Sequence, residues 1–403
     1  MILFVLGRQP EIGIAELKAV FSKDGAVSSQ PQSAAASPFS ITALDVSTTQ
    51  ALARLPQIGS VVKAAEEVTT LPQLNHTALS NTVKQLFNNV EGKITLGVSF
   101  YGNKISKKST IQLAQDIASI LKPTNSVRLV PIESNELSSA AVLHNKLAGN
   151  NPKKCELIFI KNRDGSVTVG RTFFVQDITE YTFRDRRRPK RDAHNGMLPP
   201  KLAQTMINLA HGATAPSLAR QTPALLDPFC GTGVVLQEAA LMGMAVYGTD
   251  LAERMAEFTT ENLKWLEHTH HIKVDSQVTA ADATTFAWNK WTKPDKPINL
   301  VATETYLGRP YVTAPSISEL HDNIGNCNVI IQKFLSNLAK QLAKGTGLCI
   351  AVPCWFVHGK LHHLTCLNNL SAMGYRDLYG KQHLIYHRKD QVVGRELLVL
   401  QKV

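Results

Sequence analysis

The segment LLDPFCGTG, from Leu225 to Gly233, constrains the fold of this chain more than any other stretch. Two leucines lead into Asp227, and Gly231 and Gly233 precede the apolar stretch 234–242. A strand that enters a helix through a glycine-containing turn lets its backbone approach a ligand closely. The segment therefore predicts a nucleotide-type binding loop. An ordinary strand-to-helix turn of an α/β domain has the same local pattern, so the neighbouring elements must decide.

Length and composition limit the class of protein. At 403 residues the chain exceeds what one core usually organises, so we expect two or three domains. No apolar run approaches the roughly 18 residues that a membrane-spanning helix needs, so we expect no membrane-spanning segment, no membrane partner and no signal peptide. The cysteines form no CxxC pair, and the pairs His270/His271 and His362/His363 lack further ligand-type residues at a suitable spacing. We therefore expect no metal, no disulfide framework and a cytoplasmic location.

The charge of the chain favours a polyanionic partner. The net charge is +11, and most of the basic excess precedes the glycine loop. Its densest part is a basic cluster within 176–192 (QDITEYTFRDRRRPKRD), where guanidinium groups could bind RNA phosphates. The cluster consists of Arg184, Arg186, Arg187, Arg188, Lys190 and Arg191, and Lys107 and Lys108 add a second basic site before a helix. A solvated charged linker is the alternative, although Tyr181 and Phe183 would add stacking surfaces.

The first half of the chain alternates short strands and helices. The patterns predict strands at 2–6, 39–44 and 59–65, a loop at 28–37, and then helices and strands up to residue 174. The order of the later elements, with the stretch SSAAVLHNKL from Ser138 to Leu147, resembles a THUMP domain, an RNA-binding module of tRNA-modifying enzymes. Residues 1–68 would form a ferredoxin-like α+β region in front of it.

Three central motifs carry a more specific resemblance. The stretches RDRRRPKRD, GMLPPKLAQTMINLA and LLDPFCGTG, with GRQPEIGIAELKAVF near the start, resemble the tRNA guanosine-10 N2-methyltransferases. The resemblance implies a THUMP-like domain at 69–175, a basic linker at 176–194 and a methyltransferase domain at 195–403. The expected fold is an α/β, Rossmann-like class I methyltransferase with a seven-stranded, mostly parallel sheet, preceded by the α+β THUMP-containing region. The expected partner is tRNA; some relatives also use a small activating subunit.

Acidic residues after successive strands indicate how a cofactor would bind. Asp250 ends the strand after the glycine loop, near the spacing of about 20 residues at which dinucleotide-binding folds place the carboxylate that binds ribose hydroxyls. Its alternative role is the N-cap of the helix 252–267. The resemblance implies S-adenosylmethionine, with Phe229, Gly231 and Gly233 in its binding loop. It places Asp227 at the cofactor's ammonium and Asp282 at its adenine, where a turn aspartate is the other interpretation.

The acceptor site is expected after the strand 298–302. Methyltransferases that act on amino groups carry an Asp-Pro-Pro-Tyr type of motif there, in which a carboxylate or amide binds the amine and the aromatic ring stacks on the base. Here Glu304 and Tyr306 match the carboxylate and the ring, while Thr305 stands where a proline is expected. The departure leaves three functions open. They are methylation of guanine N2, methylation of another amino group such as adenine N6 in RNA or DNA, and RNA binding without catalysis.

The remainder continues the α/β pattern. A long helix is expected at 318–342, a strand at 348–352, a second helix at 361–373, and a terminal antiparallel pair at 382–387 and 394–401.

Overall fold

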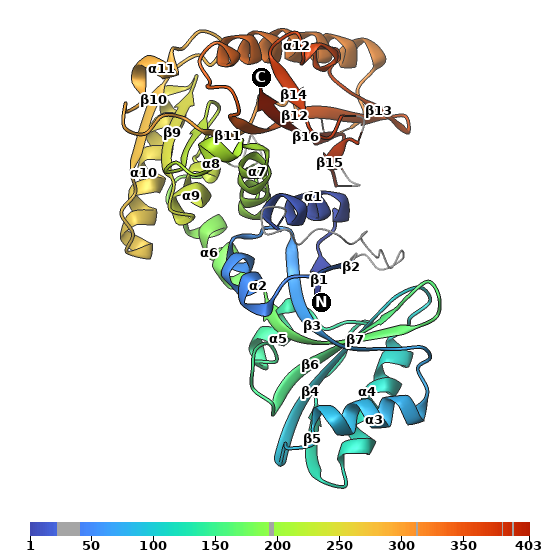
Figure 1. Cartoon of the computed structure of the whole chain (residues 1–403). Coiled ribbons are helices and arrows are strands. Elements are labelled where there is room, and N and C mark those ends of the chain that lie inside the picture. The colour runs from blue at the N-terminus through green and yellow to red at the C-terminus, as the bar shows by residue number, and fades with distance from the viewer. Residues whose placement is uncertain (22–40, 193–196, 312, 381, 389–390) are drawn as a thin grey trace. The chain divides into compact units, whose positions relative to one another are not determined.

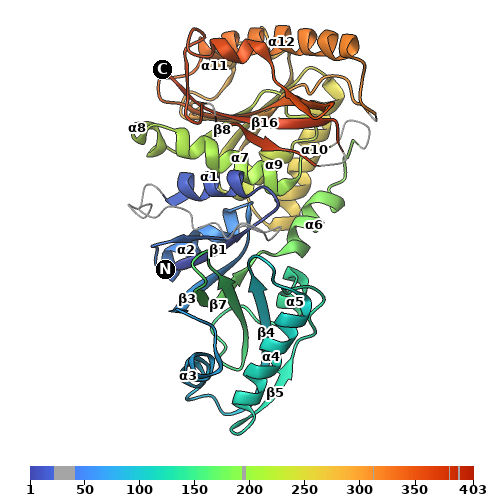
Figure 2. The ribbon, with the colours of Figure 1, turned by 90° about the vertical axis from the view of Figure 1, so that its right-hand side faces the viewer.

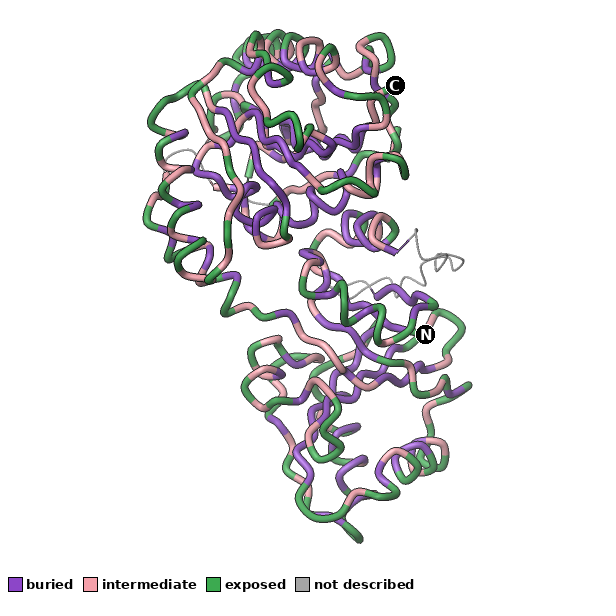
Figure 3. Tube along the Cα trace, turned by 60° about the vertical axis from the view of Figure 1, so that its left-hand side comes forward, coloured by how far each residue is buried: buried purple, intermediate pink, exposed green. Residues whose placement is uncertain are grey.

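The computed structural model describes residues 1–21, 41–192, 197–311, 313–380, 382–388 and 391–403. The expected loop at 28–37 lies outside these residues. The chain divides into two compact units: unit 1 comprises Met1–Ile14, Lys23–Pro56 and Ser60–Glu180, and unit 2 comprises Ala15–Ser22, Gln57–Gly59 and Tyr181–Val403. In each unit the central strands are largely buried (Figure 3).

Unit 1 is built on one seven-stranded sheet of order β2-β1-β3-β7-β6-β4-β5. The sheet is mixed, because β4 pairs in parallel with β5 and β6 whereas the other pairs are antiparallel. Residues expected to belong to two domains thus share one sheet. Its strands are β1 (Ile2–Leu6), β2 (Ile41–Leu44), β3 (Val61–Leu71), β4 (Gly92–Tyr101), β5 (Asn125–Leu129), β6 (Lys154–Lys161) and β7 (Val167–Val175).

The helices of unit 1 supply its main core. α3 (His76–Leu86) and α4 (Lys107–Leu121) lie side by side and pack apolar side chains on β4 and β6 (Figure 1). The shorter α2 (Thr48–Arg54) and α5 (Ser139–His144) begin at serine N-caps, whose hydroxyls accept a backbone N–H of the first turn. α1 (Pro10–Phe21), η2 (Leu55–Gln57) and α6 (Ile178–Arg187) each contain residues of both units.

Unit 2 has the sheet that the sequence predicts. Seven strands follow the order β10-β9-β8-β11-β12-β16-β14, parallel from β10 to β12 and antiparallel beyond. The prediction of a seven-stranded, mostly parallel sheet is confirmed for this path; two short strands that pair outside it bring the sheet to nine strands. These strands are β8 (Ala224–Asp227), β9 (Ala245–Asp250), β10 (Ser276–Ala280), β11 (Leu300–Glu304), β12 (Gly347–Val357), β14 (Tyr375–Asp377) and β16 (Val393–Lys402). Two short strands, β13 (Lys360–His362) and β15 (Leu384–Tyr386), pair with β12 and β16 outside this path.

Helices cover both faces of this sheet (Figure 2). On one face lie α7 (Pro200–Ala213), α9 (Val234–Leu241) and α10 (Glu253–His270). On the other face lies the long α12 (Ile317–Ala339; Figure 1). Its Leu320, Ile331 and Phe334 are buried in the core that it shares with the strands. The short α8 (Pro216–Ala219), α11 (Trp288–Trp291) and η3 (Thr365–Asn369) complete the unit. No helix among the described residues is both long enough and apolar enough to cross a bilayer.

Two expectations for the C-terminal part are wrong. The stretch 361–373 is not one helix: it contains the end of β13 and the short η3, because Leu364, Cys366 and Leu370 turn inward and pack under α12. The edge strand of the sheet is β14, which the sequence analysis missed. The expected strand at 382–387 exists as β15, but it pairs with β16 outside the main path.

Candidate active site

Four acidic residues lie at one edge of the unit 2 sheet. Because β8, β9, β10 and β11 run parallel, their carboxyl ends meet at this edge. Asp227 ends β8, Asp250 ends β9, Asp282 follows β10, and Glu304 ends β11. Ligands of open α/β sheets bind outside the carboxyl ends of the strands, so the edge is the candidate active site.

The glycine loop adopts the conformation that its composition predicts. Gly231 and Gly233 have positive φ of 51° and 83°, where other residues are strained. A Cβ on Gly233 would come within 2.9 Å of the Thr259 side chain, whereas a Cβ on Gly231 would meet nothing within 4 Å. Gly233 is therefore required for packing, and Gly231 leaves open space in which a ligand can approach the backbone.

Two side chains of α10 support the loop from below. Thr259 Oγ1 donates to the carbonyl of Gly231 at 2.8 Å, and Asn262 Nδ2 donates to the carbonyl of Thr232 at 2.8 Å. The Asn262 side chain also accepts a hydrogen bond from the Lys190 amide through Oδ1 and donates one to the Lys190 carbonyl through Nδ2, each at 2.9 Å. Neither residue was predicted from the sequence, although their spacing of three on one predicted helix face was a usable signal.

Asp227 is a buried carboxyl group with an unusual acidity. Its side chain is 2% exposed, and Oδ1 accepts from Thr303 Oγ1 at 2.6 Å and from the Phe229 amide at 3.2 Å. Burial raises the pKa of Asp227 to about 7, against the opposing effect of these hydrogen bonds. Burial also raises the pKa of the nearby Cys230 thiol, which keeps it protonated.

Asp250 links the loop to the second strand. Its Oδ2 accepts from the Gly231 amide at 2.9 Å and its Oδ1 from the Ala252 amide at 3.0 Å. The expected alternative of an N-cap is not observed, because α10 begins after Ala252 without a side-chain cap. The next residue, Leu251, is 77% exposed and offers an apolar surface beside the carboxylate.

Asp282 makes the contacts of a turn aspartate. Its Oδ1 accepts from both the amide and the hydroxyl of Thr284 at 2.8 Å, and the residue is exposed. These contacts correspond to the turn interpretation; a contact with adenine stays a prediction.

Glu304 is held by an arginine that the sequence analysis did not identify. Arg395 Nε of β16 donates to Glu304 Oε1, and the two side chains are only 12% and 17% exposed. Burial raises the pKa of Glu304, while the Arg395 guanidinium opposes the shift. One carboxylate oxygen is thus fixed by the arginine, which positions the other for a further donor.

Thr305 and Tyr306 adopt contrasting positions after β11. The Thr305 amide and hydroxyl both donate to the carbonyl of Ala351 on β12, at 3.0 and 3.1 Å. Two hydrogen bonds therefore fix the backbone where the sequence comparison led us to expect a rigid proline. The Tyr306 side chain is 43% exposed, so its ring is available to a ligand.

The basic cluster separates into inward and outward side chains. Arg184 makes a buried bidentate ion pair with Glu238, with distances of 2.8 and 3.1 Å. Arg188 is 3% exposed and contacts Asp185, and burial lowers its pKa. Lys190 pairs with Glu261 at 3.3 Å. Arg186, Arg187 and Arg191 are exposed, as are Lys107 and Lys108 at the start of α4.

The aromatic residues beside this cluster pack inside the protein. Tyr181 is 8% exposed and lies under the Arg184 guanidinium at 4.6 Å, and Phe183 contacts the Trp265 ring at 5.7 Å. The inward residues Tyr181, Arg184 and Arg188 follow i, i+3, i+7 spacing, a helical signal that was available in the sequence.

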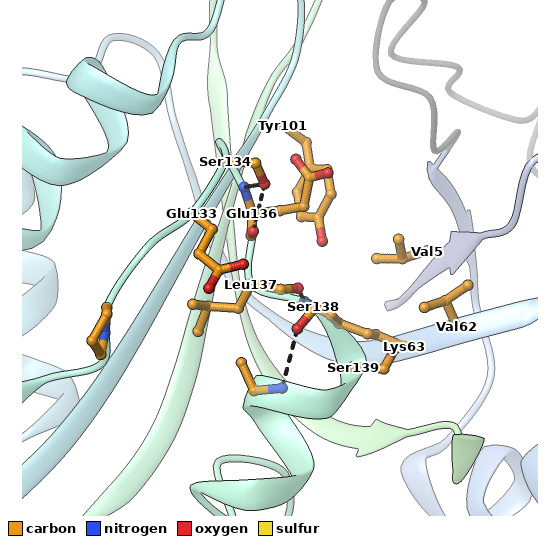
Figure 4. A pocket seen from close by; sticks show the side chains of 12 residues that line it. Val5, Val62, Lys63, Tyr101, Glu133, Ser134, Glu136, Leu137, Ser138 and Ser139 are labelled. Carbon is orange, nitrogen blue, oxygen red and sulfur yellow. Dashed lines mark hydrogen bonds between the residues drawn. The ribbon is translucent and has the colours of Figure 1, made fainter. Parts of the chain in front are cut away.

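Unit 1 contains a separate pocket of about 370 Å³ (Figure 4). Its lining includes Lys63, Tyr101, Glu136 and Ser138 and contains no glycine. The buried Lys63 contacts Glu156 through its Nζ at 2.6 Å. Burial lowers the pKa of this lysine, but Glu156 and Tyr101 together outweigh that effect, so its pKa is raised. The pocket has none of the nucleotide-loop features of the unit 2 edge.

Comparison with known proteins agrees with this geometry. The UPF0020 family, described as an RMKL-like methyltransferase domain, matches residues 186–327. The tRNA (guanine(10)-N2)-dimethyltransferase of Methanothermobacter thermautotrophicus is 34% identical over 158 residues, which are 39% of each chain. That of Pyrococcus abyssi is 36% identical over 127 residues, which are 32% of each. The chain thus matches well under half the length of these two relatives.

A shorter relative decides the family. The probable tRNA (guanine(10)-N2)-dimethyltransferase of Methanothermococcus thermolithotrophicus is 31% identical over 126 residues, which are 31% of this chain and 72% of that protein. The chain belongs to the tRNA (guanine(10)-N2)-dimethyltransferase family. The family that the three central motifs predicted is therefore confirmed.

The fold of this family member also has a solved counterpart. The crystal structure of TrmN from Thermus thermophilus is similar with a TM-score of 0.51, covering 100% of this chain and 99% of that chain at 13% identity. At this identity the likeness establishes the fold alone. The expected class I methyltransferase fold of the C-terminal half is confirmed.

Proposed function

We propose that the chain is an S-adenosylmethionine-dependent methyltransferase that methylates the N2 amino group of a guanosine in tRNA, with position 10 as the target. The observation that carries the proposal is the placement of Glu304 and Tyr306 at the end of β11, next to β8 and its glycine loop. Donor and acceptor groups would therefore meet at one edge of the sheet. The names of the relatives supply the nucleotide position.

The residues at this edge fit the proposed cofactor. Asp227 offers an acceptor for an ammonium group, Asp250 offers one for ribose hydroxyls, and Leu251 offers an apolar face for a purine. The open space above Gly231 admits a ligand close to the backbone. When bound, S-adenosylmethionine supplies a methyl group on a sulfonium, which an amine nucleophile can accept.

Glu304 and Tyr306 would prepare the amine. The exocyclic nitrogen of guanine is a poor nucleophile because its lone pair is delocalised into the base. The Glu304 oxygen that Arg395 does not bind accepts an N–H of the amine and directs the lone pair toward the methyl group. The exposed Tyr306 ring stacks on a base that has left the helix and fixes its plane.

Exposed basic residues would hold the tRNA. Arg186, Arg187 and Arg191 present guanidinium groups to solvent, and Lys107 and Lys108 present ammonium groups from unit 1. Such groups bind backbone phosphates without reading sequence. Arg184, Arg188 and Lys190, which belong to the same cluster, make ion pairs within the protein and would contribute less.

Transfer of labelled methyl groups into tRNA tests the proposal. We expect N2-methylated guanosine on nucleoside mass spectrometry, and the mass distinguishes one methyl group from two. Glu304→Gln and Tyr306→Ala should lower turnover at least tenfold while calorimetric cofactor binding stays near wild type. The appearance of N6-methyladenosine, or methylation of DNA alone, would contradict the substrate. Wild-type turnover of both variants would contradict the assignment of the site.

The partners and location are part of the proposal. Transfer by the purified chain alone would exclude a requirement for a small activating subunit. A cytoplasmic location is supported by the six cysteines, all of them buried free thiols. Cell fractionation with an antibody tests it.

A further inference from the structure

Three potential metal ligands converge outside the candidate active site. His363 follows β13, His383 precedes β15, and Glu396 lies in β16. One ligand atom of each lies within 4.8 Å of the others. The expectation of no metal rested on spacing along the chain, which could not bring these residues together because 33 and 13 positions separate the histidines from Glu396.

The carboxylate at the centre of this cluster is buried. The Glu396 side chain is 5% exposed and shares its face of β16 with the buried Leu398 and Leu400. His363 Nδ1 lies 2.6 Å from Glu396 Oε2, and His383 Nδ1 lies 2.5 Å from Oε1. Among the described residues, these imidazoles are the recorded ionic partners of Glu396.

The two imidazoles also constrain each other. Their rings stack with centroids 4.3 Å apart and planes 27° apart, and both turn Nδ1 toward the carboxylate. Charging both rings would place two cations at this separation against one carboxylate, which is unfavourable. A divalent cation bound by the Nδ1 atoms of two neutral rings would replace their hydrogen bonds to Glu396 and compensate the buried carboxylate.

We propose that His363 Nδ1, His383 Nδ1 and one Glu396 oxygen bind a zinc-type divalent cation. Two histidines and one glutamate are a known zinc ligand set, and water takes the fourth position. Ligands at roughly 2.0–2.1 Å from a tetrahedral ion lie about 3.3 Å apart, so the present contacts must open by several tenths of an ångström. The partly exposed histidine side chains, at 30% and 45%, can make that shift.

The ion would act as a cross-link between short elements. β13 and β15 have three residues each and lie outside the main sheet path, so few backbone hydrogen bonds hold them. Joining His363 and His383 to β16 ties both segments to a long central strand. Arg395, the residue before Glu396 in β16, donates to Glu304. The bound ion would therefore also restrain the part of β16 from which Arg395 positions the Glu304 carboxylate.

Metal binding to the full chain tests the proposal directly. Protein stripped with a chelator should take up one equivalent of Zn²⁺ in calorimetry, and Co²⁺ should give the visible absorption of a four-coordinate site. His383→Ala, at a partly exposed position, should lower the affinity at least a hundredfold and abolish the cobalt spectrum. His362→Ala, which changes the neighbouring histidine outside the cluster, should leave both unchanged.

Two results would overturn the proposal. One is a wild-type chain that binds no more Zn²⁺ than the His383→Ala variant. The other is a cobalt spectrum that persists in both His383→Ala and Glu396→Gln. A melting temperature that Zn²⁺ raises in the wild type and in His362→Ala, but not in His383→Ala, would support the structural role. None of these measurements depends on methyl transfer.

Discussion

At the scale of single residues, the candidate site contains two carboxyl groups, Asp227 and Glu304, whose pKa values burial raises. Asp227 is the clearest case, because it is almost inaccessible and has no cationic side chain among its recorded hydrogen-bond partners. A cofactor ammonium would supply the missing positive charge. Protonation of Asp227 and cofactor binding should therefore oppose each other.

We predict that cofactor affinity rises with pH up to about 7, the pKa of Asp227, and then levels off. Below this value affinity should fall by up to about tenfold per pH unit, because the neutral acid no longer attracts the ammonium. Calorimetry at several pH values, in buffers of different ionisation enthalpy, measures both the affinity and the released proton. The same slope in Asp227→Asn would contradict the assignment.

The raised pKa also affects folding. The folded chain holds the Asp227 proton more tightly than the unfolded chain, so the stabilising effect is complete below the unfolded pKa and is lost as pH rises through about 7. At pH 8 without cofactor, Asp227→Asn should therefore unfold at a higher denaturant concentration than the wild type. At pH 4 the difference should nearly vanish.

Thr305 provides a second test at this scale. Thr305→Val keeps the branched shape but removes the hydroxyl bond to Ala351, which should lower the free energy of unfolding by about 1 kcal/mol and reduce turnover several-fold. Thr305→Ser retains the hydroxyl and is the matched control. Denaturant unfolding and steady-state kinetics measure the two effects. A valine variant with wild-type behaviour would show that the bond does not position Tyr306.

Local sequence identified part of this site. Asp227, Gly231, Gly233 and Asp250 follow strands within one short βαβ stretch, so periodicity and turn chemistry locate them. Arg395 could not be found in this way, because it lies 91 positions after Glu304 and meets it only when β16 pairs with β12. Spacing along the chain carries no information about such a contact.

At the scale of elements, α6 shows how secondary structure sorts a basic cluster. A helix directs side chains to opposite faces, so adjacent arginines can have different environments. Arg184 faces Glu238, whereas Arg186 and Arg187 face solvent. A count of basic residues in the sequence therefore overestimates the number of side chains that can contact RNA. Helical spacing separates the side chains that face the protein from those that face solvent.

We predict that Arg186→Ala, Arg187→Ala and Arg191→Ala together weaken tRNA binding and reduce its salt slope by about one for each lost phosphate contact. Binding titrations at several salt concentrations measure both. Arg184→Ala is the contrasting variant: it leaves Glu238 uncompensated and should cost roughly 3–5 kcal/mol of stability. An unchanged salt slope in the triple variant would assign these arginines to a solvated surface.

Elements were predictable where their pattern was long. The 23-residue α12 and the 11-residue β12 show sustained apolar patterns, whereas β13, β14 and η3 have three to five residues each, too few for a period to appear. The sequence pattern also predicts a helix at 361–373. Tertiary packing under α12 decides its conformation instead.

At the scale of the whole molecule, the chain has two compact units, each with its own sheet and core. Unit 2 carries every candidate cofactor residue, while unit 1 carries Lys107 and Lys108. Separate cores allow each unit to respond to its own ligand.

We predict that S-adenosylhomocysteine slows amide hydrogen exchange in peptides covering 227–233 and 250–252 but leaves β4 and β6 unchanged. tRNA should instead slow exchange at the start of α4 and in α6, because phosphates bound there stabilise these helical segments. Exchange monitored by mass spectrometry, with the triple arginine variant as the control for α6, separates the two responses. Cofactor-dependent slowing throughout β4 and β6 would contradict separate responses.

The two hydrogen bonds of Thr305 make the conformation of the turn after β11, which carries Tyr306, depend on the pairing of β11 with β12. A proline ring restricts its own backbone wherever it stands, but Thr305 is held only while Ala351 of β12 remains beside β11. Any perturbation that separates these central strands would release Tyr306 at the same time. The ability to orient a base should therefore disappear together with global folding, without a preceding local melting of the turn.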